Sequence, residues 1–349
     1  MKKILSLGLI LSFVISLVGC QGGVNDLSIG EVSIAKTLRI GLNADTAGID
    51  DVGFNNSAYE GLVKAKKDFR IKYGILQSKK VEDYEKNITN LTKHNSLIFG
   101  IGFRMKDSIE NVAKNNTDKS FVIIDNVSDL ANVKSVTFKD EEGAFLMGII
   151  AGKMTKTNKV GFIGGVEAPI IEQIASGFTY GVKTVNEEAA TDLINKNNIR
   201  YTMDFYNEEK GYNAAKELYS RGVDVIFHGA GKCGIGVFKA AKEEGRYAIG
   251  IDEDQGEELK EYSDCILSSM IKKTDLVVYS SIKEFLKGTF RSGKDNALDL
   301  GLKEGAIDIA SSTKNKVPED ILNVVNKYKE SIIGGEMKIP KTNNELVGS

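Results

Sequence analysis

The chain has 349 residues, two histidines, three cysteines and a formal net charge of −2 at pH 7. This mildly acidic balance, without a block of basic residues, argues against a nucleic acid as the partner. The cysteines lack metal-ligand spacing, so we expect no metal site and no Cys–His nucleophile. Cys233 and Cys265 are either two free thiols or one disulfide.

The N-terminal segment has the pattern of an export signal. Two lysines precede an apolar run over residues 4–18, and small residues stand just before Cys20. This pattern is typical of a lipoprotein leader, residues 1–19, after which Cys20 becomes the lipidated first residue. The alternatives are an ordinary signal peptide or a single anchor helix, but the apolar run is shorter than a span of about 20 residues. Residues 20–36, rich in glycine and short polar residues, predict a flexible tether that holds the body at the extracytoplasmic face of a cell membrane.

Apolar, β-rich runs then alternate with helical patterns along the whole body. Repeated units of this length predict an α/β fold with parallel sheets covered by helices on both faces. Strands are expected at Thr37–Leu42, Lys72–Leu76, Ser96–Ile101, Phe121–Asp125, Lys134–Phe138, Val160–Gly164, Tyr201–Phe205, Val223–Phe227, Tyr247–Ile251 and Cys265–Met270. Helices are expected at 55–68, 83–93, 105–115, 140–153, 169–185, 209–220, 234–244 and 273–288.

The series of strands and helices restarts at KTNKVGFIGG, after a long apolar helix, which favours two sheets over one. We expect the chain to cross back after Met270 and to cross a last time near residues 301–305. Three such crossings make a hinge between two lobes. The expected lobe 1 comprises residues 37–152 and 273–302, and lobe 2 comprises residues 153–272 and 303–349. Ligands of open α/β sheets bind beyond the carboxyl ends of the strands, so those ends should line a cleft.

Polar and aromatic residues gather where the expected strands of lobe 1 end. The turn after the first strand carries Asp45, Asp51, Phe54 and Asn55, and Asp125 directly follows the apolar run FVII. Phe54 is flanked by short polar residues, which favours a place at the cleft; a hydrophobic staple at the helix start is the alternative. A helix cap or turn acid is the alternative for Asp125.

In lobe 2, Phe205, Asp252 and Lys272 stand at expected strand ends, and Gly229-x-Gly231-x-x-Gly234 precedes a helix. Two aromatic rings with carboxylates and a lysine suit a flat ring that carries a hydroxylated appendage. The glycines followed by Asp252 also match a dinucleotide fingerprint, which would indicate an NAD-dependent oxidoreductase. Such an enzyme usually carries this motif on its first strand. A nucleoside pocket can use the same helix start and acid without a pyrophosphate, so we expect neither an enzyme nor a cofactor.

Residues 36–340 resemble the basic membrane protein family of bacterial lipoproteins. The resemblance is carried by DTAGIDDVGFNNSAYEGL, FVIID, GVDVIFHGAGKCGIGVFKAAKE and YAIGIDEDQ, among other motifs. It implies a type I periplasmic-binding-protein fold with two lobes and three hinge crossovers. It also implies a monomeric substrate-binding lipoprotein of an ABC transporter, which captures a purine nucleoside such as adenosine, guanosine or inosine for a permease and its ATPase.

The resemblance further implies roles for individual residues. The purine would lie between Phe54 and Phe205, with Tyr206 as the alternative second ring. Asp125 would accept hydrogen bonds from the base edge, and Asp252 and Lys272 would hold the ribose hydroxyls. The other residues expected around the ligand are Asp45, Asp51, Asn55, Gly229 and Gly231.

Two turns depart from the family pattern. DVGFN at residues 51–55 stands where many members have DKSFN, and GKCG at residues 231–234 stands where GGTG is usual. These departures bear on selectivity for the ribose or base edge more than on the fold. A surface adhesin or antigen of the same fold is the alternative to a transport role, but it leaves the cleft residues unexplained.

Overall fold

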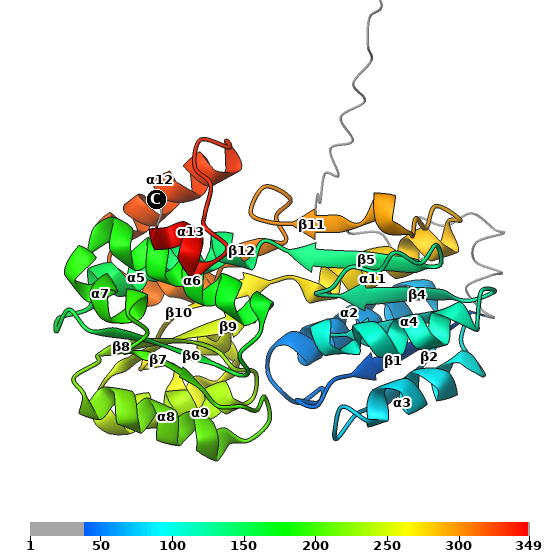
Figure 1. Ribbon diagram of the computed structural model, residues 1–349, viewed down its shortest axis with the longest axis horizontal. Helices are drawn as coiled ribbons and strands as arrows, with labels where there is room; N and C mark the ends of the chain where they lie inside the picture. The colour runs from blue at the N-terminus through cyan, green and yellow to red at the C-terminus, as the bar shows by residue number, and fades with distance from the viewer. Residues whose placement is uncertain (1–37, 348–349) are drawn as a thin grey trace, which may run out of the picture.

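The computed structural model describes residues 38–347. The expected leader, Cys20 and the tether lie outside the described residues. Across residues 38–347, none of the helices is both long and apolar enough to cross a membrane. This part of the chain forms two α/β lobes that lie side by side, each with a sheet between two layers of helices (Figure 1).

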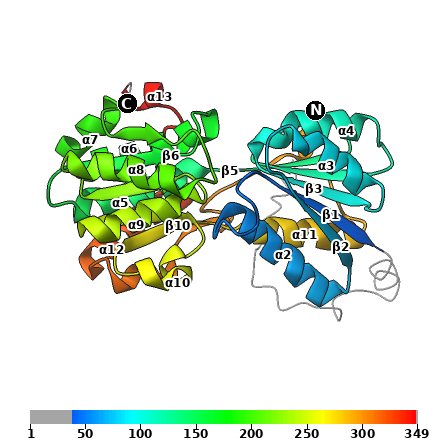
Figure 2. The same ribbon diagram turned by 90° about the horizontal axis from the view of Figure 1, so that it is seen from below.

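Lobe 1 is built from the strands β1 (Arg39–Ala44), β2 (Lys72–Gln77), β3 (Leu97–Ile101), β4 (Ser120–Ile124), β5 (Val133–Phe138) and β11 (Leu298–Leu300). Its helices are α2 (Phe54–Phe69), α3 (Asp83–Thr92), η2 (Phe103–Met105), α4 (Lys106–Lys114), α11 (Thr274–Leu286) and η4 (Lys294–Asn296). The strand order is β11-β5-β4-β3-β1-β2, and every pairing is parallel. Helices α2 and α11 cover one face and α3 and α4 the other (Figure 2), which explains why β3 and β4 are almost continuously apolar.

Lobe 2 is built from the strands β6 (Val160–Gly164), β7 (Ile199–Tyr201), β8 (Val225–Gly229), β9 (Tyr247–Asp252), β10 (Ile266–Lys272) and β12 (Ile307–Ile309). Its helices are α5 (Asp140–Met154), α6 (Pro169–Val185), α7 (Glu187–Ile194), α8 (Glu208–Ser220), α9 (Cys233–Glu244), α10 (Gln255–Glu258), η3 (Lys260–Tyr262), η5 (Ser311–Asn315), α12 (Glu319–Ile333) and α13 (Asn343–Val347). The strand order is β12-β10-β9-β8-β6-β7, with only β12 antiparallel to its neighbour. Helices α8 and α9 cover one face, and α5, α6, α7 and α12 form the layer on the other.

Three segments connect the lobes, at Lys139, at Lys273 and over residues 301–306. They are bonded to one another, because the N–H of Lys139 donates to the carbonyl of Leu300 at 2.8 Å and the N–H of Lys273 donates to that of Ala306 at 2.9 Å. Two parallel-dominated sheets with three crossovers confirm the expected fold class.

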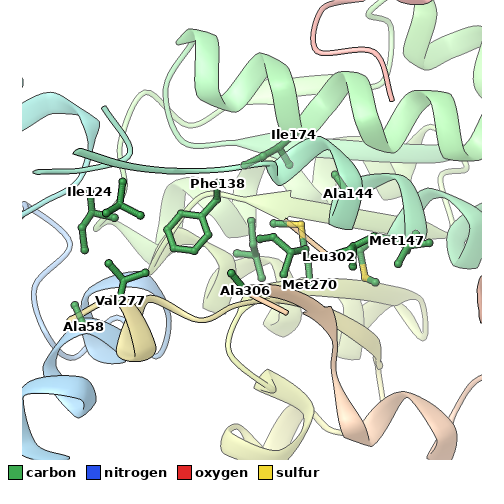
Figure 3. Close-up of a cluster of buried hydrophobic side chains, with 14 of the residues drawn as sticks. Ala58, Ile124, Phe138, Ala144, Met147, Ile174, Met270, Val277, Leu302 and Ala306 are labelled. Atoms are coloured by element: carbon green, nitrogen blue, oxygen red, sulfur yellow. The ribbon is translucent and has the colours of Figure 1, made fainter. Parts of the chain in front are cut away.

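An apolar core continues from one lobe to the other beneath these crossovers. Ile124 and Val277 of lobe 1, Phe138 at the end of β5, and Met270 and Ala306 beyond it lie in one row of buried side chains (Figure 3). The lobes are therefore packed against each other at the crossovers as well as joined by the three backbone segments.

The expected end of lobe 1 at residue 152 is wrong, because α5 belongs to lobe 2. This helix packs along α6 so closely that a Cβ on Gly148 would lie 2.2 Å from the carbonyl oxygen of Phe178. A Cβ on Gly143 would lie 2.6 Å from the side chain of Ile307 on the other side of the helix. Helix α5 is apolar on all sides, so its sequence gave no sign of which sheet it covers. The chain leaves lobe 1 at Lys139.

The strand expected at Tyr201–Phe205 is displaced. The strand ends at Tyr201, and the following polar residues form a turn in which the hydroxyl of Thr202 donates to the carbonyl of Asp204 at 2.6 Å. The neighbouring carboxylate of Asp204 accepts the N–H of Tyr206 at 2.9 Å. Side chains that bond their own backbone favour turns over strands, and Phe205 therefore sits on a loop.

Candidate functional site

A cavity lies between the lobes, at the carboxyl ends of both sheets. The space between protein atoms there is about 570 Å³, including the part open to solvent. All ten candidate ligand residues line it: Asp45, Asp51, Phe54, Asn55, Asp125, Phe205, Gly229, Gly231, Asp252 and Lys272.

Asp51 and Asn55 hold the turn that leads into α2. The carboxylate of Asp51 accepts the N–H groups of Gly53, Asn55 and Asn56 at 3.0–3.1 Å, which caps the helix start. The Asn55 amide donates to Asp45 and to Asp51, both at 2.9 Å, and its oxygen accepts the N–H of Asp45 at 3.0 Å. The polar atoms of Asp51 and Asn55 are therefore occupied within the protein, and these residues position Asp45 and Phe54.

Asp125 and Asp252 occupy corresponding places in the two lobes. Asp125 follows β4 and Asp252 ends β9, and both backbones are left-handed, with φ of 68° and 72°. Aspartate tolerates this conformation better than most residues, yet it still costs energy, and such positions cluster at binding sites. The left-handed backbone stops each strand and places the carboxyl group in the cavity.

Lys272 is the cation at the centre of the site. Its ammonium lies 2.8 Å from the carboxylate of Asp125 and 3.2 Å from that of Asp140, and it stands 5.0 Å from the centre of the Phe54 ring. Burial opposes its charge, but the carboxylates of Asp125, Asp140 and Asp252 raise the pKa of Lys272. Because Asp125 is in lobe 1 and Asp140 in lobe 2, Lys272 links the lobes beside the hinge.

Burial also shifts the carboxyl groups of the site. It raises the pKa of Asp45 to about 6 and the pKa of Asp140 to about 7. It raises the pKa of Asp252 well above its ordinary range, although the charge on Lys272 opposes this shift. Within residues 38–347, no side chain or backbone group donates a hydrogen bond to the Asp252 carboxylate, which is 7% exposed. The carboxyl group of Asp252 is therefore available to bond a ligand.

Aromatic and branched side chains form the apolar walls. Phe54 begins α2 in lobe 1 and Phe205 comes from the loop after β7 in lobe 2. The Phe205 ring packs closely on Gly165, where a Cβ would lie 2.1 Å from a ring carbon. Tyr206 is 55% exposed and does not line the cavity, so Phe205 is the ring that faces it.

Sequence reasoning missed one aromatic and one charged residue of this site. Phe103 lines the cavity, and its ring meets that of Phe205 edge-on, with centroids 6.5 Å apart. Asp140 begins α5 and contacts Lys272. Each follows a strand by only one or two residues, so the strand-end argument that selected Asp125 applied to both. The three isoleucines of α6 that line the cavity carried no comparable signal.

The glycine pattern has a different cause from a phosphate site. A Cβ on Gly234 would lie 2.0 Å from the ring of His228, which is fully buried between β8 and α9. Gly231 has a φ of 55°, and a Cβ there would lie 3.0 Å from the carbonyl of Phe205. Gly234 thus makes room for a core histidine and Gly231 for the Phe205 loop. Cys233, in the same turn, is a buried free thiol, as is Cys265.

Two lobes of this fold, joined by three crossovers around a cavity with apolar walls, define a solute-binding protein of the periplasmic-binding type. The family model described as ABC transporter substrate-binding protein PnrA-like matches residues 38–343, and the chain belongs to this family. The family is one of solute-binding proteins that serve ABC transporters, not one of enzymes.

Curated relatives and a solved structure are similar to the chain over most of its length. The chain is 36% identical to a CD4+ T-cell-stimulating antigen of Listeria innocua, over 97% of this chain and 98% of the relative. It is 34% identical to the ABC transporter nucleoside-binding protein BmpA of Lactococcus lactis, over 97% and 99% of the two chains. A crystal structure of an ABC transporter solute-binding protein from Aeropyrum pernix matches with a TM-score of 0.76, covering 89% of this chain and 96% of that one at 24% identity, and supports the fold.

Proposed function

We propose that the protein captures a purine nucleoside in the cavity between its lobes and delivers it to the permease and ATPase of an ABC transporter. The observation that carries this proposal is the pairing of Phe54 and Phe205, from opposite lobes, in one cavity with an unbonded Asp252. The name of the Lactococcus relative, a nucleoside-binding protein, supports the same ligand class.

Stacking would supply much of the affinity. A planar base between Phe54 and Phe205 has a phenyl group on each side, and aromatic contacts contribute about 1–3 kcal/mol per base. Ile170, Ile171 and Ile174 add apolar surface from α6. A neutral heterocycle fits these walls better than a charged one.

The carboxylates would orient the ligand through hydrogen bonds. Asp252 accepts hydrogen bonds from ribose hydroxyls, and Asp125 accepts them from N–H groups on the base edge while Lys272 balances its charge. Buried acceptors that lose their donors are costly, so analogues lacking those groups are rejected. The carboxylate-rich lining also disfavours anionic ligands.

The mature protein would be monomeric and attached through lipid on Cys20 to the extracytoplasmic face of the cell membrane. Ligand held by both lobes favours the closed arrangement, a hinge motion about Lys139, Lys273 and residues 301–306. The closed form is then presented to the permease. No cofactor takes part.

Calorimetric titration of the unlipidated chain tests this function. Adenosine, guanosine and inosine are expected to bind, with cytidine, uridine, free ribose and NAD as comparison ligands. Binding of NAD alone would favour the dinucleotide interpretation, and binding of none of these ligands would favour an adhesin or antigen role. Either result contradicts the proposal.

A further inference from the structure

The two lobes also meet beside the cavity, through the chain neighbours of Asp51 and Gly231. Lys232 stands just before α9 in lobe 2, and Asp50 lies in the turn between β1 and α2 of lobe 1. The ammonium of Lys232 lies 2.7 Å from the carboxylate of Asp50. The hydrogen bond from Lys232 lowers the pKa of Asp50, and the same bond raises the pKa of Lys232.

This ion pair differs from a fully hydrated surface pair. The side chain of Lys232 is only 15% exposed, whereas that of Asp50 is 67% exposed. The ammonium also stands 5.0 Å from the centre of the Tyr206 ring, a cation–π distance. The side chain of Lys232 is therefore held in place on lobe 2, in a position to bond Asp50 when the lobes are closed.

Lys232 is connected to the ligand walls on both sides of the cleft. Its backbone N–H donates to the carbonyl of Phe205 at 2.9 Å, so the same residue fixes the loop of one phenyl wall. Two residues after Asp50, the carbonyl of Val52 accepts a hydrogen bond from the Gln255 side chain of lobe 2 at 2.9 Å. Two side chains of lobe 2, those of Lys232 and Gln255, therefore bond the turn that leads to Phe54.

We propose that Lys232 and Asp50 form a latch that slows ligand release by stabilising the closed lobes. The pair joins residues of different lobes, so opening the cleft separates it, whereas contacts within one lobe persist. Exposed pairs contribute little and partly buried ones somewhat more, so loss of the latch should raise the ligand dissociation rate about two- to fivefold. The association rate should change less, because affinity differences among variants of one site lie mostly in dissociation. The inference rests on the proposed nucleoside binding.

Stopped-flow dissociation of adenosine, guanosine and inosine from the full chain tests the latch with Lys232→Ala, Asp50→Ala and the double variant. Asp50→Ala leaves the contact of Lys232 with Phe205 intact, which separates the latch from any disturbance of that loop. Lys216→Ala is the matched control, because Lys216 of α8 pairs with Glu244 at the far end of α9, within lobe 2. We expect both single variants to release ligand faster, the double variant to be no faster than either, and the control to match the wild type.

High salt provides a second readout. At about 0.5 M NaCl the wild-type rate should approach that of the variants, because screening weakens an ion pair beside the cavity. Single variants that release ligand at the wild-type rate, or effects that multiply in the double variant, would overturn the latch while leaving nucleoside binding intact. A wild type that binds no nucleoside would instead contradict the proposed function.

Discussion

Replacing Lys272 by methionine should destabilise the protein, and more so at pH 7.5 than at pH 5.5. The side chain of Lys272 is 4% exposed, and its partners Asp125 and Asp140 are 5% and 0% exposed. Lys272→Met keeps a similar volume but leaves two buried carboxylates without their cation. Breaking a buried pair costs about 3–5 kcal/mol, so we expect a loss of about 4 kcal/mol in unfolding free energy at pH 7.5.

The loss should shrink as the pH falls. The pKa of Asp140 is already raised to about 7, and removing the neighbouring cation raises it further. A carboxyl group whose folded pKa lies above its unfolded value binds its proton more readily in the folded state. Stability is therefore regained as the pH decreases, by about 1.4 kcal/mol per pH unit for each extra proton bound. Because wild-type Asp140, with a pKa of about 7, also takes up its proton over this range, the loss should be smaller at pH 5.5 than at pH 7.5 by about 1 kcal/mol.

Urea unfolding of wild type and Lys272→Met, followed by circular dichroism at pH 7.5 and 5.5, measures both quantities. The double variant Asp140→Asn with Lys272→Met serves as the control. It removes one of the two carboxylates that lose their cation, so it should recover part of the unfolding free energy at pH 7.5. An equal loss at both pH values, or no loss at pH 7.5, would refute the assignment of Lys272 as the counter-ion of this cluster.

Three further predictions concern single residues. Phe205→Ala should weaken nucleoside binding about 5- to 150-fold in calorimetry, as one lost stacking contact implies, whereas Tyr206→Ala should leave the affinity nearly unchanged; equal effects would contradict the choice of ring. Asp252→Asn should weaken ribonucleosides about tenfold or more and weaken 2′,3′-dideoxynucleosides much less, because a charged acceptor contributes about 1.5–3 kcal/mol; a uniform loss would argue against a sugar contact. Burial lowers the pKa of His228 from 6.5 to about 4, so the unfolded chain binds a proton at this histidine at a higher pH than the folded protein does. Between pH 6.5 and 4, the unfolding free energy of wild type should therefore fall by roughly 3 kcal/mol more than that of His228→Leu. Parallel unfolding curves of these two proteins across that range would contradict the prediction.

Much of the cavity was predictable because parallel strands end at the same edge of a sheet. An acid directly after an apolar run, such as Asp125, then lies at the edge of the sheet that faces the cleft. The same rule extends to Phe103 and Asp140, which each stand two residues after the end of a strand. The rule locates residues but does not say whether their polar atoms are free, and the bonds of Asp51 became visible only in three dimensions.

Three errors of the fold prediction lie in segments without a periodic signal. Helix α5 is apolar on all sides, so nothing in its sequence distinguishes one sheet from the other. Strands β11 and β12 have three residues each, too few for an alternating pattern. The turn after Tyr201 depends on side-chain bonds of Thr202 and Asp204 that compete with strand pairing.

A crystal structure of the protein with bound adenosine would show the ligand in place. We expect a purine ring between Phe54 and Phe205, with ribose hydroxyls within hydrogen-bond distance of Asp252. A nucleoside bound elsewhere, or a base that touches neither ring, would contradict this expectation.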